Sequence, residues 1–346
     1  MRTTIGWRAG GDATLQRATI PRRELRADDL AVRVDYCGVC HSDLQAVRAH
    51  QGARDHVLVP GHEFTGVVTE VGGDVTGFDV GDAVAVGNIV DSCGICAMCR
   101  AGQENFCHEF PTLTYGGTDR RDGSATSGAY SREYLVRDRF AYHLPEGLDP
   151  AGAAPLLCAG ITVWEPLRAL GVGPGDRVAV VGLGGLGHLA VKLSVALGAE
   201  TTVVSRSRDK AADARRLGAH EFLVSGDTAG MSAGRDRFDV VIDTISAPHD
   251  LEPYLKLVGL DGTLSQVGYL GPVTVQTTDL LIGRKKLGSA GSGGRPATAA
   301  LLDFCARHDI TADIEVLPSA RVNEAFARLE RNDVRYRFVL DLSDLD

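Results

Sequence analysis

One glycine-rich run, GLGGLG at residues 182–187, constrains the fold of this chain more than any other feature. It follows the apolar run RVAVV, which is typical of a buried strand, and precedes HLAVKLSVALGA, which has helical spacing and closes on glycine. Here Gly182 would allow a tight turn, Gly184 would let the backbone approach a pyrophosphate, and Gly187 would let helix and strand pack closely. The context therefore favours a dinucleotide phosphate site, and a plain glycine-rich turn is the alternative.

The sequence after Pro155 alternates between strand-like and helix-like segments. The strand candidates are RVAVV (177–181), TTVV (201–204), EFLV (221–224), DVVI (239–242), TLSQV (263–267) and KKLGS (285–289). Strands that alternate with helices predict a parallel sheet covered on both faces. Six strands is the number of a full dinucleotide-binding sheet, so we predict an α/β fold with a Rossmann doubly wound six-stranded parallel sheet. Phosphate contacts are expected at Gly182, Leu183, Gly184, Gly185, Leu186 and Gly187, where a helix N-terminus offers its amides.

The end of the second strand candidate bears on which dinucleotide binds. An acidic residue there would bond the ribose of NAD, but the sequence reads VVSRSRDK, with Ser205 in that position. Arg206, Ser207 and Lys210 follow, and hydroxyl groups and guanidinium forks suit a 2′-phosphate. We therefore predict NADP(H) rather than NAD, with a solvated basic helix start as the alternative.

The first 150 residues have a different pattern. In LAVRVDY, Leu30, Val32 and Val34 alternate with Ala31 and other small or polar residues, which predicts a strand with one buried face. Short apolar runs recur at FTGVVTEV and DAVAV, and their spacing suggests a compact, mostly antiparallel, β-rich domain. The tail contains an amphipathic helix after about residue 296 and ends in the strand candidate RYRFVLDL.

Composition and length narrow the class of protein. A chain of 346 residues exceeds the size at which one core keeps growing, so two domains are expected. The formal charge of −9 argues against nucleic acid as a partner. The start has no signal-peptide pattern, and five glycines, a histidine and a lysine interrupt the apolar stretch 178–199, so we expect no membrane partner and a cytoplasmic location. In a reducing compartment, the eight cysteines are expected to be metal ligands or free thiols.

Four cysteines form the pattern C-x2-C-x2-C-x7-C. They are Cys93, Cys96, Cys99 and Cys107. Closely spaced cysteines let one loop wrap a tetrahedral zinc ion, and Gly94 and Gly102 supply backbone freedom. Four unlinked thiols and an iron–sulfur cluster are weaker alternatives. We predict a structural zinc site, which has no open coordination position and therefore stabilises the fold.

A second cysteine-containing segment, CGVCHSD, allows three interpretations. Cys37 and Cys40 could form a redox pair, but that motif normally opens a helix in a βαβ unit. A zinc ribbon with the later cysteines would need far shorter spacing. In the third interpretation, Cys40 joins His62 and Cys158 as two thiolates and one imidazole with an open position, the pattern of catalytic zinc in alcohol oxidation. Taken singly, Cys158 would be a packing residue and His62 a solvated one; together with a nucleotide fold, the joint interpretation is the stronger.

GHEFTGVVTEVG, the four-cysteine segment, APLLCAGIT and GLGGLGHLAVKL occur in this order across nearly the whole chain. In this combination the chain resembles the zinc-containing medium-chain alcohol dehydrogenase family, and most closely its cinnamyl alcohol dehydrogenase branch. The resemblance implies a GroES-like catalytic domain at 1–157 and 295–346, with a structural zinc lobe at 91–108. It also implies a Rossmann NADP-binding domain at 158–294 and a homodimer formed through the Rossmann sheets.

The resemblance assigns roles around the predicted catalytic zinc. Cys40, His62 and Cys158 correspond to its ligands. Glu63 corresponds to a carboxylate that approaches the zinc during ligand exchange. Asp43 corresponds to the group that orients the ligand histidine. Ser42 corresponds to the hydroxyl that bonds the substrate oxygen and starts a proton relay.

Further residues are assigned to the cofactor by the same resemblance. His41 falls where the family contacts the pyrophosphate, and Thr162 falls beside the nicotinamide. Val267, Gly268 and Ser289 are expected to complete the cofactor site.

Some positions depart from the family pattern. Many relatives carry a histidine three residues after the relay hydroxyl, where this chain has Gln45, which cannot titrate. Protons would then leave through water or another group, with His50 as a candidate. Cys37 is expected to be a buried thiol without a role, small residues occupy LGSAGSGG (287–294), and the contacts of the charged loop 118–128 are not predicted.

These assignments imply a zinc-dependent NADP(H) oxidoreductase that interconverts primary alcohols and aldehydes, aromatic or aliphatic, and mainly reduces aldehydes. An NADPH-dependent C=C or C=N reductase of specialised metabolism on the same fold is the alternative. A non-catalytic nucleotide-sensing or structural protein is a third hypothesis. The sequence does not predict the physiological substrate.

Overall fold

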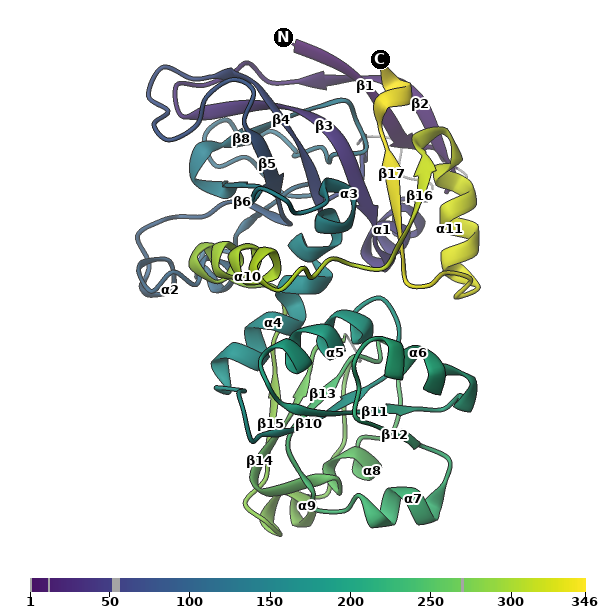
Figure 1. Ribbon diagram of the computed structural model, residues 1–346. Helices are drawn as coiled ribbons and strands as arrows, with labels where there is room; N and C mark the ends of the chain where they lie inside the picture. Colours follow the sequence, from purple (N-terminus) through teal and green to yellow (C-terminus); the bar gives the residue numbers. More distant parts are fainter. Residues whose placement is uncertain (1, 12, 52–56, 269–270) are drawn as a thin grey trace. The chain divides into compact units, whose positions relative to one another are not determined.

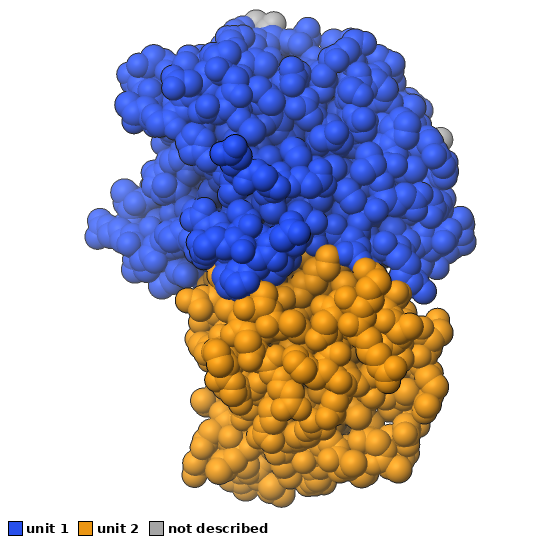
Figure 2. Space-filling view, viewed as in Figure 1, with its two compact units in different colours: residues 1–158, 293–346 blue, residues 159–292 orange. Residues whose placement is uncertain are grey.

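The structure is a computed structural model that describes residues 2–11, 13–51, 57–268 and 271–346. The chain forms two compact units, shown in different colours in Figure 2. Unit 1 contains residues 1–158 and 293–346, and unit 2 contains residues 159–292. The domain ranges expected from the family resemblance stay a prediction, because the units are defined by spatial contacts alone.

Unit 1 is rich in β-structure (Figure 1). Its strands are β1 (Arg2–Ala9), β2 (Leu15–Arg22), β3 (Asp29–Val39), β4 (Phe64–Val71), β5 (Ala83–Val86), β6 (Ile89–Asp91), β7 (Thr112–Leu113), β8 (Glu133–Arg137), β9 (Ala141–His143), β16 (Ile314–Pro318) and β17 (Arg337–Asp341). Its helices are α1 (His41–Ala49), α2 (Ala97–Arg100), α3 (Pro150–Ala153), α10 (Arg295–Arg307) and α11 (Val322–Glu330), with 3₁₀ turns η1 (Glu104–Phe106), η2 (Asp138–Phe140), η3 (Ala154–Leu157), η5 (Ser319–Arg321) and η6 (Ser343–Leu345).

The main sheet of unit 1 has the strand order β16-β17-β3-β4-β5-β9, and β8 also pairs with β3. Every pairing except β16 with β17 is antiparallel, which confirms the predicted mostly antiparallel domain. β3 is the central strand of this sheet. Ala31, assigned by its alternation to the exposed face, is fully buried. Alternation alone therefore under-predicts the core of a central strand.

Unit 2 is a parallel α/β unit. Its strands are β10 (Arg177–Val181), β11 (Glu200–Ser205), β12 (Glu221–Val224), β13 (Phe238–Asp243), β14 (Val258–Gln266) and β15 (Lys286–Ser289). Its helices are α4 (Ala159–Ala169), α5 (Gly187–Ala196), α6 (Ala211–Arg216), α7 (Thr228–Ala233), α8 (Glu252–Leu255) and α9 (Thr277–Leu281), with the 3₁₀ turn η4 (Arg208–Lys210).

The sheet of unit 2 has the order β12-β11-β10-β13-β14-β15, and all its pairs are parallel. The predicted six-stranded doubly wound sheet is therefore confirmed. The order reverses between β10 and β13, and such a switch point is where open α/β sheets bind ligands. Its core contains the apolar faces of these strands, including Ala179, Val241 and Leu264.

The long apolar stretch 178–199 does not form one helix. It contains β10, the glycine-rich turn and α5. In the part of the chain that is described, no helix has the length and apolar character needed to cross a bilayer.

Candidate active site

Three predicted metal ligands meet in unit 1. Cys40 follows β3 and is the N-cap of α1, His62 precedes β4, and Cys158 follows η3. One donor atom of each lies within 4.8 Å of the others, and His62 Nε2 lies 3.2 Å from Cys158 Sγ. Cys40 and His62 are buried. Residues separated by as many as 118 positions thus form one donor group (40 and 158).

The sheet explains why Cys40 and His62 meet. β3 and β4 are antiparallel, and Cys37 lies opposite Phe64. The residues just after β3 and just before β4 therefore lie at the same end of the sheet. The antiparallel pairing therefore explains why the segments CGVCHSD and GHEFTGVVTEVG contribute ligands to the same site.

The Asp43 carboxylate organises this end of the sheet. Its Oδ2 accepts hydrogen bonds from the Cys40 N–H at 3.0 Å and the Tyr130 hydroxyl at 3.2 Å. Its Oδ1 accepts from the Gly61 N–H and from His62 Nδ1, each at 3.0 Å. Because a carboxylate only accepts, the proton of the neutral His62 ring lies on Nδ1. The lone pair on Nε2 is then directed toward the two sulfur atoms.

The chemistry of the donor group fits zinc. Hydrogen bonding from Cys158 lowers the pKa of Cys40 well below its ordinary value. Two cysteine sulfurs, which bind zinc as thiolates, and a neutral imidazole are the protein ligands of a zinc site that keeps its fourth position open. The residues that would hold the ion are therefore Cys40, His62 and Cys158.

Glu63, next to the ligand histidine, does not belong to this donor group. Its Oε1 forms a buried ion pair with Arg337 of β17, and a Cβ on Gly38 would lie 2.4 Å from the same oxygen. Burial raises the pKa of Glu63 to about 7, although Arg337 acts in the opposite direction. Glu63 Oε2 is buried without a hydrogen-bond partner among the described residues. The approach of Glu63 to a metal stays a prediction.

Arg337 was missed by the sequence analysis, which treated RYRFVLDL only as a strand. Phe338 lies opposite Val39, so Arg337 lies beside the end of β3, where Cys40 follows. An arginine inside an apolar strand was the available signal, because such a charge is buried only when it is paired.

Two tyrosines near the donor group were also missed. Tyr130 is fully buried, and its hydroxyl bonds Asp43 as described above. The ring of Tyr115 is tilted against that of His62, with 5.8 Å between centroids. Burial and then the Asp43 carboxylate raise the pKa of Tyr115 above its ordinary value. Both flank the loop 118–128, whose contacts the sequence did not predict.

The first turn of α1 presents the remaining predicted residues of CGVCHSD. Ser42 is exposed, and its Oγ lies 3.6 Å from Cys40 Sγ. His41 and Gln45 are also exposed. His50 is the C-cap of α1, eight residues after Ser42, which is about 12 Å of helical rise. That separation is too long for a direct hydrogen bond, so a relay from Ser42 to His50 would need water.

Cys37 lies near the donor group but is directed elsewhere. It is fully buried, its Sγ donates to the Gly38 carbonyl at 3.7 Å, and burial raises its pKa well above the ordinary value. A protonated thiol of this kind does not act as a nucleophile. The geometry supports the packing role and gives no support to a redox pair.

The four-cysteine segment forms a second donor group, in which one sulfur of each cysteine lies within 4.8 Å of the others. Backbone N–H groups of Cys93, Cys96 and Cys99 donate to the sulfurs of Cys107, Cys93 and Cys96, respectively. The hydrogen bond from the Cys99 N–H is the main cause that lowers the pKa of Cys96 to about 6. Gly94 and Gly102 both have positive φ, which other residues rarely adopt. Four sulfurs in this arrangement fit a closed zinc site.

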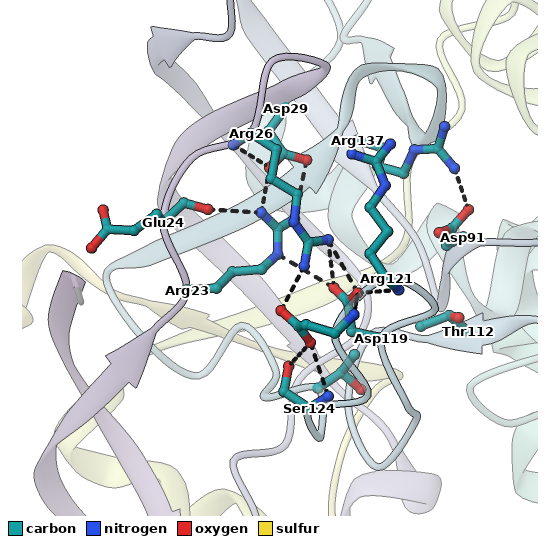
Figure 3. A network of polar contacts seen from close by, with 12 residues as sticks. Arg23, Glu24, Arg26, Asp29, Asp91, Thr112, Asp119, Arg121, Ser124 and Arg137 are labelled. Atoms are coloured by element: carbon teal, nitrogen blue, oxygen red, sulfur yellow. Dashed lines mark hydrogen bonds and ion pairs between the residues drawn. The ribbon is translucent and has the colours of Figure 1, made fainter.

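The charged loop 118–128 packs against the segment between β2 and β3 (Figure 3). Arg26 donates to Asp119 at 2.8 Å and to Asp122 at 2.6 Å. Arg121 Nη1 donates to Asp28 at 2.8 Å. These ion pairs hold the loop in place, and its two flanks carry Tyr115 and Tyr130.

The glycine-rich turn in unit 2 has the geometry that the sequence predicts. Gly182 has a φ of +89°, and a Cβ on Gly187 would lie 2.0 Å from the Gly182 carbonyl oxygen. A Cβ on Gly184 would meet open space within the described residues. The Nζ of Lys210 donates to the Leu183 carbonyl at 2.8 Å. It supports the turn directly, and its contact with a phosphate stays a prediction.

The other predicted cofactor residues of unit 2 gather at the carboxyl ends of the strands. Ser205 ends β11 and is buried, and the exposed Arg206 and Ser207 follow it. Val267 follows β14, Gly268 comes next, and Ser289 ends β15. Thr162 lies on α4, where its Oγ1 accepts from the Ser292 N–H at 3.3 Å.

Comparisons with known proteins identify the family. The family model described as the alcohol dehydrogenase GroES-like domain matches residues 26–146, and the one described as zinc-binding dehydrogenase matches residues 185–307. A probable formaldehyde dehydrogenase of Bacillus subtilis is 45% identical over 96% of this chain and 95% of its own. An NADP-dependent alcohol dehydrogenase of Mycolicibacterium smegmatis is 44% identical over 99% of both chains.

The fold leads to the same family. The solved structure of a cinnamyl alcohol dehydrogenase from Sorghum bicolor has a TM-score of 0.94 and 43% identity, and the similarity covers 98% of both chains. Together with the two family models, this similarity confirms the resemblance drawn from the sequence motifs. The chain therefore belongs to the zinc-containing alcohol dehydrogenase family and is an oxidoreductase.

Proposed function

We propose that this protein is a zinc-dependent, NADP(H)-dependent dehydrogenase that interconverts primary alcohols and aldehydes and mainly reduces aldehydes. The convergence of Cys40, His62 and Cys158 around one point, with Asp43 behind the histidine, carries this proposal. When bound there, zinc would supply Lewis acidity at the substrate oxygen, and NADPH would supply the hydride.

The chain's own residues would orient the reactants and move the proton. Asp43 holds the His62 ring so that Nε2 is available as a ligand. Ser42 is exposed next to Cys40, where its hydroxyl can exchange a proton with a substrate oxygen. Gln45 cannot titrate. In aldehyde reduction, solvent would therefore replace the proton that Ser42 gives to the substrate oxygen, and in alcohol oxidation solvent would receive the proton.

The preference for NADP(H) rests on the end of β11. Ser205 has no charge to repel a phosphate, and the exposed Arg206 and Ser207 offer a guanidinium and a hydroxyl. The relative from Mycolicibacterium smegmatis, named as NADP-dependent, supports this preference.

We also propose a homodimer. β15 is the last strand in the order of the parallel sheet, and an unpaired edge can pair with a second copy. Leu260, Leu281 and Ile282, which lie on β14 and in and just after α9 in the same unit, are large apolar side chains exposed to solvent. Sedimentation equilibrium should give twice the chain mass. A cytoplasmic location completes the proposal, because none of the eight cysteines, all of them described, forms a disulfide, which suits a reducing compartment.

A substrate panel tests the proposed reaction against its alternative. Aromatic and aliphatic aldehydes, enals and iminium compounds would be compared by kcat/KM with NADPH and with NADH. Aldehydes should be reduced at the carbonyl, with at least about a tenfold preference for NADPH, which corresponds to about 1.4 kcal/mol. Faster reduction of C=C or C=N bonds would favour the alternative. Metal analysis should give two zinc ions per chain.

A further inference from the structure

We propose that Tyr130 is a positioning residue for the three-donor metal site: its hydroxyl fixes Asp43, and Asp43 fixes the ring of His62. The inference rests on the metal site of the proposed function. It assigns a role to a residue that lies outside CGVCHSD and GHEFTGVVTEVG and that is not one of the predicted metal ligands.

The hydrogen bonds around Asp43 support this role. The Tyr130 hydroxyl lies 3.2 Å from Asp43 Oδ2 and 3.3 Å from the Gly38 carbonyl oxygen. A hydroxyl has one proton, and a carboxylate is the stronger acceptor. The Cys40 N–H shares Oδ2 with Tyr130, and Oδ1 serves Gly61 and His62. Tyr130 thus holds the oxygen opposite the one that bonds the ligand histidine.

The body of Tyr130 is itself held in place. It is fully buried, and its ring is tilted against that of Phe326 of α11 at 6.4 Å between centroids. Its N–H donates to the Pro60 carbonyl at 2.9 Å, and its carbonyl accepts from the Trp7 N–H at 2.7 Å. A Cβ on Gly61 would lie 2.6 Å from the Tyr130 ring. With ring and backbone both fixed, the hydroxyl provides a rigid donor for Asp43.

The energetic consequence is a change in metal retention. Groups that orient a ligand histidine typically change metal affinity by about 10–100-fold when they are removed. Tyr130→Phe removes one oxygen atom and keeps the ring that packs against Gly61. Asp43 would keep its bonds to Cys40, Gly61 and His62 but lose its side-chain donor on Oδ2. The carboxylate, and with it the ring of His62, would then be held less firmly.

The experiment measures zinc transfer from the full-length holoenzyme to the chromophoric chelator 4-(2-pyridylazo)resorcinol. The wild type should release two zinc ions in separate phases, and Cys40→Ser identifies the phase of the three-donor site. Tyr130→Phe should accelerate that phase by about tenfold and leave the four-cysteine phase unchanged. The matched control is Tyr134→Phe, because Tyr134 is also buried but its hydroxyl donates to the Thr114 carbonyl at 2.9 Å. This control should release zinc at the wild-type rate.

A double-mutant cycle separates positioning from a general loss of packing. If Tyr130 acts through Asp43, Tyr130→Phe should have little further effect on zinc release in the Asp43→Asn background. The inference would be overturned if Tyr130→Phe released zinc at the wild-type rate, or if Tyr134→Phe accelerated release as much as Tyr130→Phe does. It would also be overturned if the effects of Tyr130→Phe and Asp43→Asn were additive. A wild type that holds only the four-cysteine zinc would overturn the proposed function as well, so the two failures are distinguishable.

Discussion

The two donor groups of unit 1 differ in how the chain assembles them. The four cysteines lie within residues 93–107, and the backbone of the same loop donates hydrogen bonds to their sulfurs. The three-donor group joins residues 40, 62 and 158, and its supporting hydrogen bonds come from side chains, Asp43 next to Cys40 and Tyr130 far along the chain. A local group can form wherever its loop forms. A dispersed group forms only when the sheet has folded.

The ligands themselves are buried to a similar extent in the two groups, so their number and support make the difference. Cys40 and His62, like Cys99 and Cys107, are buried, and the other three ligands are partly exposed. The carboxylate that supports the dispersed group, Asp43, is fully buried. The local group has four ligands and is closed, so it suits a stabilising role. The dispersed group has three, so it suits chemistry at a fourth position. Substitutions in the two groups should therefore affect different properties.

The largest effect is expected on activity, from the dispersed group. Cys40→Ser or His62→Ala should reduce turnover by at least about a thousandfold, because several kcal/mol of transition-state stabilisation by the metal would be lost. Circular dichroism should show that the fold is kept. Aldehyde reduction and alcohol oxidation would both be measured. Alcohol oxidation retained in either variant would contradict the ligand assignment.

The local group should show the opposite pattern. Cys107→Ser should lower the melting temperature by on the order of 10 °C, because a structural zinc site contributes several kcal/mol to folding. Metal analysis should find one zinc ion per chain, and the protein that remains folded should retain far more activity than Cys40→Ser. A Cys107→Ser variant with normal stability and no activity would reverse the roles of the two groups.

The same contrast explains what the sequence could predict. The four cysteines and GLGGLG could be predicted from the sequence because their spacing alone defines the loop or turn. The ligands at 40, 62 and 158 could be predicted from the short motifs around them and from the family resemblance. Arg337 could not be predicted, since its partner Glu63 is 274 residues away and lies beside it only because β17 pairs with β3.

The contacts of Tyr130 and the ion pairs of loop 118–128 could not be predicted for the same reason. Tyr130 and Asp43 are 87 residues apart, and Arg121 and Asp28 are 93 apart. Spacing in the sequence does not indicate such contacts when neither partner belongs to a known motif. The hydrogen bond from Lys210 to the Leu183 carbonyl, 27 residues earlier in the chain, was also not predicted.

The contacts that support the dispersed group could matter because their partners are far apart in the sequence or because they are buried. The ion pairs of loop 118–128 can distinguish these two explanations. Arg121 and Asp28 are as dispersed as Tyr130 and Asp43, but the Arg121 side chain is 41% exposed. If burial decides, Arg121→Ala should cost only about 0.5 kcal/mol of unfolding free energy at pH 7, and less at high salt. If the separation in the sequence decides, Arg121→Ala should cost about as much unfolding free energy as the loss of a hydrogen bond to the buried Asp43. Chemical denaturation at low and high salt would measure it.

Acid titration of the same variant checks that the ion pair is the cause. The hydrogen bond from Arg121 is the main cause that lowers the pKa of Asp28 in the folded protein. A lowered carboxyl pKa stabilises the fold above the unfolded value of about 4, and the stabilisation is lost as the pH falls through the folded pKa. The difference between wild type and Arg121→Ala should therefore be constant near neutral pH and disappear in acid. If the stability difference between wild type and Arg121→Ala persisted below the folded pKa of Asp28, it would come from packing of the arginine stem and not from the ion pair. The comparison of Arg121 with the buried Asp43 contacts would then measure apolar packing, not charge.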